Sequence, residues 1–219
     1  DEEELNQRNP LFIRSKGIKL ALFNATYGTN MGLGTHWPKT NYLSARTQLE
    51  SALSKAKEAD ADVTIAFPHW GTEYVLKHSA RQEETAIWLA ESGADMIIGA
   101  HPHVIQDFQM LETSETNGYK KVPVAYSLGN AVSNMSARNT QLGLLAKISV
   151  VRLHNGDLKF LPIDFTYIWC SRPGGYNRSY TVIPVKKFIG KRDRWIGSYD
   201  YDKMIDTYRH VKEKTGIKD

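Results

Sequence analysis

A chain of 219 residues with 41% apolar content can bury the core of one domain, or at most two. Its one cysteine, Cys170, excludes an internal disulfide and a cysteine-based zinc cluster, so a bound metal would take nitrogen and oxygen ligands. The sequence has no run of about eighteen apolar residues, which is the length that a membrane-spanning helix requires.

The net charge of +4 comes from the C-terminal segment. Residues 186–219 carry ten Lys or Arg and six Asp or Glu, so the rest of the chain is balanced. The basic and acidic side chains are interleaved there, which is typical of a solvated surface and disfavours the alternative, a phosphate-binding face. We therefore expect no nucleic-acid partner. The acidic start, 1–4, is unlike a signal peptide and more typical of a mature or internal start.

The first predicted elements form a β-hairpin, in which the apolar runs 10–13 and 18–23 flank a turn. The polar loop 24–30 follows the second strand and contains Asn24 and Tyr27. This loop is either a plain turn or part of a binding site at the end of a buried strand.

A glycine-rich, irregular segment follows over 31–42, and we treat its histidine, His36, as a surface residue. The next predicted element is a helix over 44–59. Its apolar residues recur at spacings of three and four, which places them on one face that packs on a sheet. These residues are Leu49, Ala52, Leu53 and Ala56.

A second helix is predicted between two strands. Ser79 and Gln82 match the Ser-x-x-Gln capping box of a helix start, and Gly93 is typical of the position after a helix end. The flanking apolar runs, 63–67 and 96–98, are predicted strands, so together they form a right-handed βαβ unit. The apolar surface of the helix is assigned to Ile87, Trp88 and Ala90.

The remaining elements extend the sheet. A surface hairpin or other surface excursion is predicted over 112–121, followed by a strand over 122–128. Two strands, 142–153 and 158–169, are joined by a turn whose Asn-Gly pair is a strong hairpin signal. The last element is an amphipathic helix over 202–215. Its apolar stripe consists of Met204, Ile205, Tyr208 and Val211.

Histidines follow both strands of the βαβ unit. His69 comes after the first strand, and His101 and His103 flank Pro102 after the second. Parallel strands of such a unit end at the same edge of the sheet, so we expect the three imidazoles to converge. Neutral imidazole is the commonest protein ligand for transition metals, and the pattern therefore predicts a metal site. The alternative is a set of histidines tied to local backbone.

Two other polar residues could act beside these histidines. Glu73 could orient an imidazole, bind the metal or act as a general base, unless it is a plain surface carboxylate. Asn130 offers a carbonyl oxygen to a metal or an amide to a phosphate, unless it only shapes a turn. A catalytic pair of metal ions normally needs a bridging carboxylate as well. The sequence has no Asp-x-His or Asn-His-Asp arrangement, so we expect only part of a site.

Several short blocks of the sequence occur together in an order that resembles one known family. They are Gly-Ile-Lys-Leu-Ala-Leu at 17–22, Thr-Tyr-Gly-Thr-Asn at 26–30, His-Trp-Gly-Thr-Glu at 69–73, Gly-Ala-His-Pro-His-Val at 99–104 with Gln106, and Tyr-Ser-Leu-Gly-Asn at 126–130. The set resembles the CapA/PgsA family of bacterial poly-γ-glutamate capsule biosynthesis proteins, over roughly 9–170. That family has a fold similar to the calcineurin-like metallophosphoesterases, an α/β/β/α sandwich with a two-metal site.

The resemblance implies roles for individual residues. His69, His101 and His103 become the candidate ligands of divalent Mn, Fe or Zn ions, and Glu73 and Asn130 become the candidate catalytic residues. The candidate substrate contacts are Trp70, Gly71, Asn24, Tyr27 and Gln106.

The resemblance also implies that part of the family's fold is missing. Family members have an N-terminal half with a Gly-Asp strand end, an Asn-x-Glu block and an Asn-Asn-His segment, and the chain shows no such half. We therefore expect an α/β fold, with mixed sheets flanked by helices as in part of that sandwich. The expected single domain, 1–219, has its core over 9–170 and a C-terminal extension over 171–219. Without the carboxylate half, the chain need not retain the ions.

The leading hypothesis is a CapA-like protein of capsule or poly-γ-glutamate biosynthesis in the bacterial envelope, at the periplasm or the cell surface. As an enzyme, it would hydrolyse a phosphoester or related bond with the help of metal ions. Its expected partners are an anionic polymer or phosphoester substrate and other capsule-synthesis proteins. The alternative is a non-catalytic binding or scaffold protein for an anionic polymer.

Overall fold

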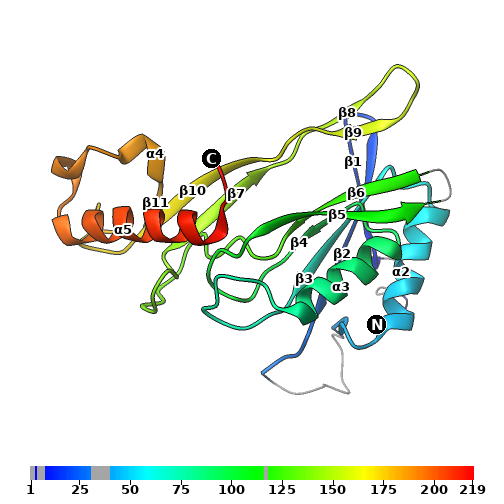
Figure 1. Cartoon of the computed structure of the whole chain (residues 1–219), viewed down its shortest axis with the longest axis horizontal. Helices are drawn as coiled ribbons and strands as arrows, with labels where there is room; N and C mark the ends of the chain where they lie inside the picture. Colours follow the sequence, from blue (N-terminus) through cyan, green and yellow to red (C-terminus); the bar gives the residue numbers. More distant parts are fainter. Residues whose placement is uncertain (1–2, 4–7, 31–39, 116–117) are drawn as a thin grey trace. The chain divides into compact units, whose positions relative to one another are not determined.

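The computed structural model describes residues 3, 8–30, 40–115 and 118–219, so His36 lies outside the described residues. The chain divides into two compact units that alternate along the sequence (Figure 1). The first unit comprises Asp1–Gly71, Ser79–Ala100 and Gln109–Tyr126, and the second comprises Thr72–His78, His101–Phe108 and Ser127–Asp219. The expectation of a single domain over 1–219 stays a prediction.

The first unit is built on a six-stranded mixed sheet with the strand order β1-β2-β3-β4-β6-β5. Its strands are β1 (Leu11–Ser15), β2 (Ile18–Thr26), β3 (Val63–His69), β4 (Met96–Ile98), β5 (Phe108–Glu115) and β6 (Gly118–Ala125). β1 pairs antiparallel with β2, whereas β2, β3, β4 and β6 run parallel. The predicted N-terminal hairpin and the predicted βαβ unit are therefore confirmed.

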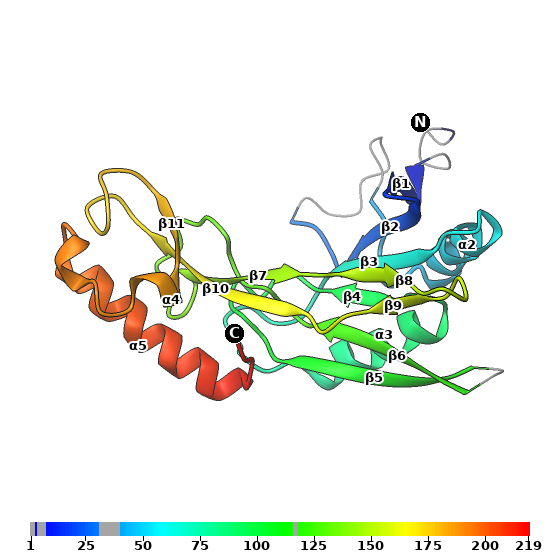
Figure 2. The same cartoon turned by 90° about the horizontal axis from the view of Figure 1, so that it is seen from above.

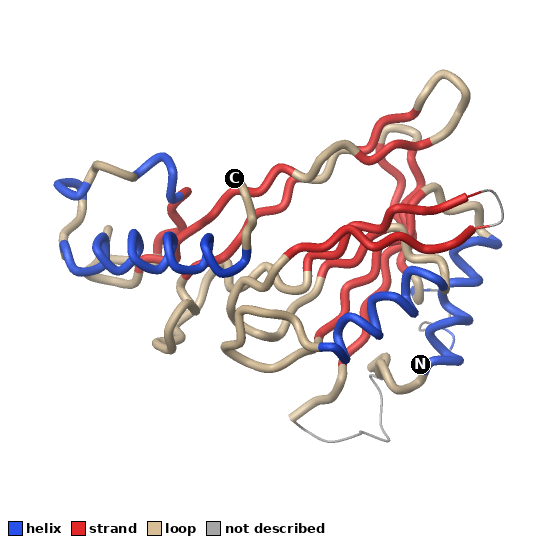
Figure 3. The backbone as a smooth tube through the Cα atoms, in the orientation of Figure 1, coloured by secondary structure: helices blue, strands red, loops and turns tan. Residues whose placement is uncertain are grey.

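Two helices, α2 (Arg46–Glu58) and α3 (Ala80–Glu91), cover one face of this sheet (Figure 3). Phe23 and Ala25 of β2 both belong to the buried cluster beneath them, as the two-residue period of a strand requires. α2 buries all four apolar residues that their spacing predicts. The expected α/β fold, with a mixed sheet flanked by helices, is confirmed.

The capping box at the start of α3 forms as predicted. Ser79 Oγ accepts a hydrogen bond from the backbone amide of Gln82 at 3.3 Å, and the side-chain oxygen Oε1 of Gln82 accepts one from the backbone amide of Ser79 at 3.0 Å. The assignment of Ile87 to the packed face is wrong, because its side chain is 39% exposed. The buried stripe runs through Ala86 and Leu89, and Ile87 lies about 100° away from Ala86 around the helix.

The second unit contains a three-stranded antiparallel sheet with the order β11-β10-β7. Its strands are β7 (Leu142–Lys147), β10 (Asp164–Ser171) and β11 (Thr181–Pro184), and Figure 2 shows β7 and β10 side by side. The long helix α5 (Ser198–Thr215) belongs to the same buried cluster as this sheet. The predicted stripe, Met204, Ile205, Tyr208 and Val211, contributes to this cluster together with Tyr201.

The two long strands predicted over 142–153 and 158–169 are both interrupted. β8 (Val150–Arg152) and β9 (Leu158–Phe160) form a separate hairpin around the predicted Asn-Gly turn. Pro162 lies between β9 and β10, and proline lacks the amide donor that a strand ladder needs. Two short helical segments, α4 (Val185–Phe188) and η1 (Arg192–Arg194), precede α5. Among the described residues, the helices are all too short or too polar to cross a membrane.

The capping box of α3 gives a first prediction. Ser79→Ala should lower the free energy of unfolding by about 1 kcal/mol, because the amide of Gln82 loses its acceptor. Ser54→Ala is the matched control, since Ser54 is exposed inside α2 and alanine favours a helix. Urea unfolding of both variants measures the difference. Equal effects of the two substitutions would contradict a stabilising cap at Ser79.

Candidate metal centre

Two loops of the second unit, 72–78 and 101–108, are joined through a buried glutamine. Gln106 is only 1% exposed, and its Nε2 donates to the carbonyl oxygens of Val75 at 3.0 Å and Lys77 at 3.2 Å. The side chain thus holds one loop against the other. The prediction that Gln106 contacts a substrate stays a prediction.

Further contacts join the same loops. The amide of Tyr74 donates to the carbonyl oxygen of Pro102 at 2.8 Å, and His78 Nδ1 lies 2.9 Å from Asp107 Oδ2. These contacts adjoin Glu73 on one loop and the His-Pro-His segment on the other. The two loops are therefore held together by contacts that do not involve the side chains of Glu73, His101 and His103.

A carboxylate and two histidines form a cluster at this junction. One ligand atom from each of Glu73, His101 and His103 lies within 4.8 Å of the other two. His103 Nε2 and Glu73 Oε1 lie 4.0 Å apart, and the two imidazole centroids are 6.0 Å apart. Two imidazoles and one carboxylate suit zinc, manganese or iron. The cluster is a candidate metal centre.

The backbone of this cluster is strained. His101 has a φ of +105° and His103 a φ of +60°, values that glycine adopts far more readily than other residues. Each such residue costs of the order of 1–3 kcal/mol and persists only where the surroundings impose it. The neighbouring Tyr74 also has a positive φ, of +66°. Histidine at positions that favour glycine indicates that the imidazole side chains have a function there.

Asn130 determines which nitrogen of His103 is available. Its Nδ2 donates to the carbonyl oxygens of His103 at 3.2 Å and Thr140 at 2.9 Å, so its Oδ1 is the atom that faces His103 Nδ1, at 3.1 Å. An amide oxygen only accepts hydrogen bonds, so Nδ1 carries the proton and Nε2 is left with its lone pair. That Nε2 is the atom that faces Glu73. Asn130 is therefore placed to orient a ligand, and its predicted catalytic role stays a prediction.

Tyr74 is a member of the site that the sequence pattern does not reveal. Its ring stacks on His103, with the centroids 6.4 Å apart and the planes at 26°. A hydrogen bond with Glu73 raises the pKa of the Tyr74 hydroxyl above its ordinary value, which keeps the phenol protonated as a donor to the carboxylate. Tyr74 thus contacts two of the three cluster residues.

His69 belongs to the first unit, where it ends β3. The ring of Tyr27 stacks on it, with the centroids 6.2 Å apart and the planes at 2°, and the Tyr27 amide donates to its carbonyl oxygen at 2.9 Å. His69 also forms a parallel bridge with Ala100. The three predicted histidine ligands are thus divided, two in the cluster of the second unit and one in the first unit. A metal role for His69 stays a prediction.

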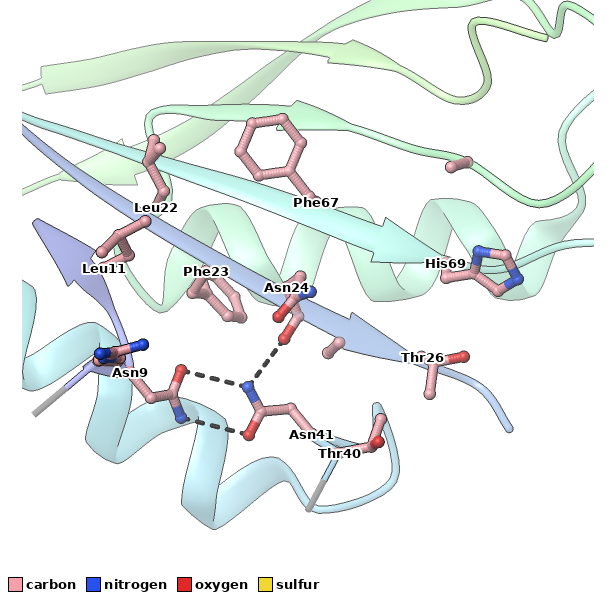
Figure 4. A pocket seen from close by; sticks show the side chains of 13 residues that line it. Asn9, Leu11, Leu22, Phe23, Asn24, Thr26, Thr40, Asn41, Phe67 and His69 are labelled. Atoms are coloured by element: carbon pink, nitrogen blue, oxygen red, sulfur yellow. Dashed lines mark hydrogen bonds between the residues drawn. The ribbon is translucent and has the colours of Figure 1, made fainter. Parts of the chain in front are cut away.

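A cavity of about 680 Å³ lies beside His69 in the first unit. Figure 4 shows His69 and Asn24 at its wall, together with Phe67 of β3. Asn9 and Asn41 pair through two hydrogen bonds of 3.2 Å at its edge, and Asn41 also donates to the carbonyl oxygen of Asn24 at 2.9 Å. The predicted substrate contacts Asn24 and Tyr27 therefore lie near His69.

The other two predicted substrate contacts shape the end of β3. Trp70 is only 2% exposed, and its Nε1 donates to the carbonyl oxygen of Tyr126 at 2.9 Å. Gly71 has a φ of +92°, and a Cβ atom there would lie 2.8 Å from the Gln82 side chain. Both positions are thus determined by packing, and contact with a substrate stays a prediction.

Two solved structures are similar to this chain at low identity. The crystal structure of a 5'-nucleotidase precursor from Thermus thermophilus aligns with a TM-score of 0.43 and 12% identity, covering 92% of this chain and 34% of that one. The calcineurin-like phosphoesterase YfkN from Bacillus subtilis aligns with a TM-score of 0.38 and 14% identity, covering 91% and 54%.

Two curated relatives match part of the chain. A capsule biosynthesis protein CapA from Bacillus anthracis is 40% identical over 138 residues, which are 61% of this chain and 32% of that protein. A PGA biosynthesis protein CapA from Bacillus subtilis (strain 168) is 26% identical over 148 residues, 68% of this chain and 37% of that protein. The chain therefore spans about a third of the length of these relatives.

A family model described as "Bacterial capsule synthesis protein PGA_cap" matches residues 1–135. This match ends earlier than the expected span of 9–170, and residues 136–219 lie beyond it. It covers more than half of the chain and includes Glu73, His101, His103 and Asn130. The chain therefore belongs to the PGA_cap family of bacterial capsule synthesis proteins.

Proposed function

We propose that the chain binds a divalent metal ion through Glu73, His101 and His103, and that this ion serves the hydrolysis of a phosphoester or related bond in capsule synthesis. The observation that supports it is the convergence of three ligand atoms within 4.8 Å of one another. Structural metal sites close all four positions with protein ligands, whereas catalytic ones commonly keep a position open beside three. A cluster of three donors therefore favours chemistry over a purely structural ion.

The accessibility of the cluster supports the same proposal. The side chains of His103 and Glu73 are 34% and 45% exposed, so a substrate in solution can reach them. A bound dication would supply a Lewis acid and would activate water for hydrolysis. The carboxylate of Glu73 would offset part of its charge, while the two neutral imidazoles would add none.

The surrounding residues would prepare the ligands before any ion binds. Asn130 holds His103 in the tautomer whose Nε2 can donate to a metal. Tyr74 donates a hydrogen bond to Glu73 and stacks on His103, which restrains both ligand side chains. Partners of this kind commonly affect metal affinity by about 10- to 100-fold. His69 remains a further predicted ligand from the sequence.

The relatives support the setting of the proposed reaction. They are named for capsule and PGA biosynthesis, and the chain matches them over a stretch of about 140 residues. We infer a role at the bacterial cell envelope, with an anionic capsule polymer or a phosphoester as substrate and other capsule-synthesis proteins as partners.

Metal binding tests the proposal directly. The wild-type chain should bind Mn²⁺ or Zn²⁺ in isothermal titration calorimetry, and His101→Ala, His103→Ala and Glu73→Gln should each weaken it about tenfold or more, since each removes one ligand. His154→Ala is the control, because His154 is exposed in the β8–β9 hairpin. His69→Ala, measured alongside, tests the third histidine.

The outcomes of this experiment separate binding from catalysis. Two results would contradict the metal centre. One is a wild-type chain that binds neither ion, and the other is unchanged affinity in the His101→Ala and His103→Ala variants. A longer protein containing this chain should hydrolyse p-nitrophenyl phosphate when loaded with metal. Metal binding without any hydrolysis of phosphoesters or polymer would instead indicate a non-catalytic binding protein.

The orienting role of Asn130 can be separated from its anchoring role. Asn130→Ala removes both and should weaken metal binding by about 10- to 100-fold. Asn130→Asp keeps an acceptor for His103 Nδ1 but loses the donor to two carbonyl oxygens, so it should retain metal binding while lowering the melting temperature. Calorimetry and thermal unfolding of both variants provide the comparison. Equal metal affinity in the two variants would argue against orientation by hydrogen bonding.

The strained backbone predicts a difference between two substitutions of one ligand. His101→Gly and His101→Ala both remove the imidazole, but only glycine relieves a φ of +105°. The glycine variant should therefore be more stable than the alanine variant by about 1–2 kcal/mol in urea unfolding. Neither should bind metal normally. An alanine variant as stable as the glycine variant would contradict strain at this position.

A further inference from the structure

A second cavity lies in the second unit, away from the histidine cluster in sequence. Its volume is about 260 Å³, and it is lined by the loop after β10 and by the start of α5. The residues that line it all come after 135, where the family match ends. This cavity therefore belongs to the part of the chain that the family model does not describe.

One lysine is held at the wall of this cavity by a buried amide. Lys203 Nζ donates to Gln141 Oε1 at 2.6 Å. Gln141 is only 3% exposed, and its Nε2 donates to the carbonyl oxygen of Cys170 at 2.9 Å. Because that donor is used, the amide oxygen is directed at the lysine. The ammonium group is thus kept at the cavity and does not extend freely into solvent.

A second cation, Arg172, lines the same cavity. Its side chain donates to the carbonyl oxygen of Asn134, while its Nε is buried and has no hydrogen-bond partner in the described structure. That nitrogen is closed to solvent, so Arg172 contributes the positive charge of its guanidinium to the cavity and not a hydrogen bond from Nε. Burial and then repulsion from Arg172 lower the pKa of Lys203, and attraction to Asp200 opposes this.

The one carboxylate at the cavity, Asp200, is already used by the protein. Its Oδ2 accepts hydrogen bonds from Ser171 Oγ at 2.6 Å, Trp169 Nε1 at 3.1 Å and Trp195 Nε1 at 3.2 Å. Three donors on one oxygen leave it little capacity to pair with either cation. The lining therefore contains two positive groups, Lys203 and Arg172, and one carboxylate, Asp200, whose Oδ2 already accepts three hydrogen bonds.

The backbone around the cavity is glycine-rich and closely packed, with no room for a side chain at two of the glycines. A Cβ atom at Gly175 would lie 2.5 Å from Asp200 Oδ2, and one at Gly197 would lie 2.7 Å from the carbonyl oxygen of Gly174. Gly197 is also the N-cap of α5, an 18-residue helix, and it brings no side-chain cap to the first turn. The amides of that turn add positive potential at the same end of the cavity.

We propose that this cavity binds an oxyanion, a single carboxylate or phosphate group, between Arg172, Lys203 and the first turn of α5. Its volume suits one such group and not a whole cofactor. Tyr199 lines the mouth and is 78% exposed, so it can contact the rest of a larger ligand. The site does not depend on the proposed metal centre, and the two can fail separately.

Nuclear magnetic resonance titration of the ¹⁵N-labelled full chain tests the site. The indole resonances of Trp169 and Trp195 and the amides of Gly174, Gly175 and Gly197 report on it directly. Inorganic phosphate and γ-glutamylglutamate are added in separate arms at constant ionic strength. Saturable shifts in the phosphate arm identify a phosphate site, those in the peptide arm identify a carboxylate site, and shifts in both identify a site for either oxyanion.

Substitutions show whether these shifts come from the cavity. Lys203→Gln should weaken binding about tenfold or more, because it removes a charged donor. Lys214→Gln makes the same charge change on the same helix at an exposed position and should leave affinity unchanged. Tyr199→Asp alters an exposed side chain and should also weaken binding, which keeps the test valid if Lys203→Gln unfolds. Absent or unsaturable shifts in both arms, or equal losses in Lys203→Gln and Lys214→Gln, would overturn the proposal.

Discussion

The ends of the central strands of the first unit are joined by one buried hydrogen bond, from Trp70 Nε1 to the carbonyl oxygen of Tyr126, at 2.9 Å. This bond passes directly over Gly99, where a Cβ atom would lie 2.1 Å from the Tyr126 oxygen and 2.3 Å from Trp70 Nε1. Each of the three residues comes from a different block of the family pattern, just beyond β3, β4 and β6. The bond therefore fixes the ends of three neighbouring strands. From each of these strand ends the chain continues into the second unit. The family-like blocks at 69–73, 99–104 and 126–130 therefore share a structural role, besides any role in chemistry.

The histidine cluster combines an unfavourable backbone with well-satisfied polar neighbours. Positive φ at His101 and His103 costs of the order of 1–3 kcal/mol each, which the loops must offset. The buried amide of Gln106 and the three polar contacts of Asn130 to His103 and Thr140 supply compensating hydrogen bonds. Such an arrangement is expected where the position of a side chain is more important than a low-energy backbone conformation. It is the same physical logic that places strained residues at binding sites in general.

The fold was largely predictable because its signals are local. The spacing of Leu49 and Leu53 and the capping box at Ser79 act within one or two helical turns, and both predictions are confirmed. The cluster was partly predictable, since Glu73, His101 and His103 stand out as polar residues after strands. The anion cavity was not, because Arg172 and Lys203 are far apart in sequence and meet only through tertiary packing. Interleaved charges indicated a solvated tail, yet Lys203 is half-buried, so charge pattern alone could not reveal it.

The charge of the cluster constrains the chemistry that it can perform. Glu73 brings one negative charge to the three ligand atoms, while the imidazoles of His101 and His103 bring none when they act as ligands. One dication would therefore retain a net positive charge there, which would attract an anionic group. A second dication at the same ligands would add two further positive charges without a bridging carboxylate to offset them. The cluster by itself thus suits a single ion, because a second ion would need a further carboxylate to offset its charge.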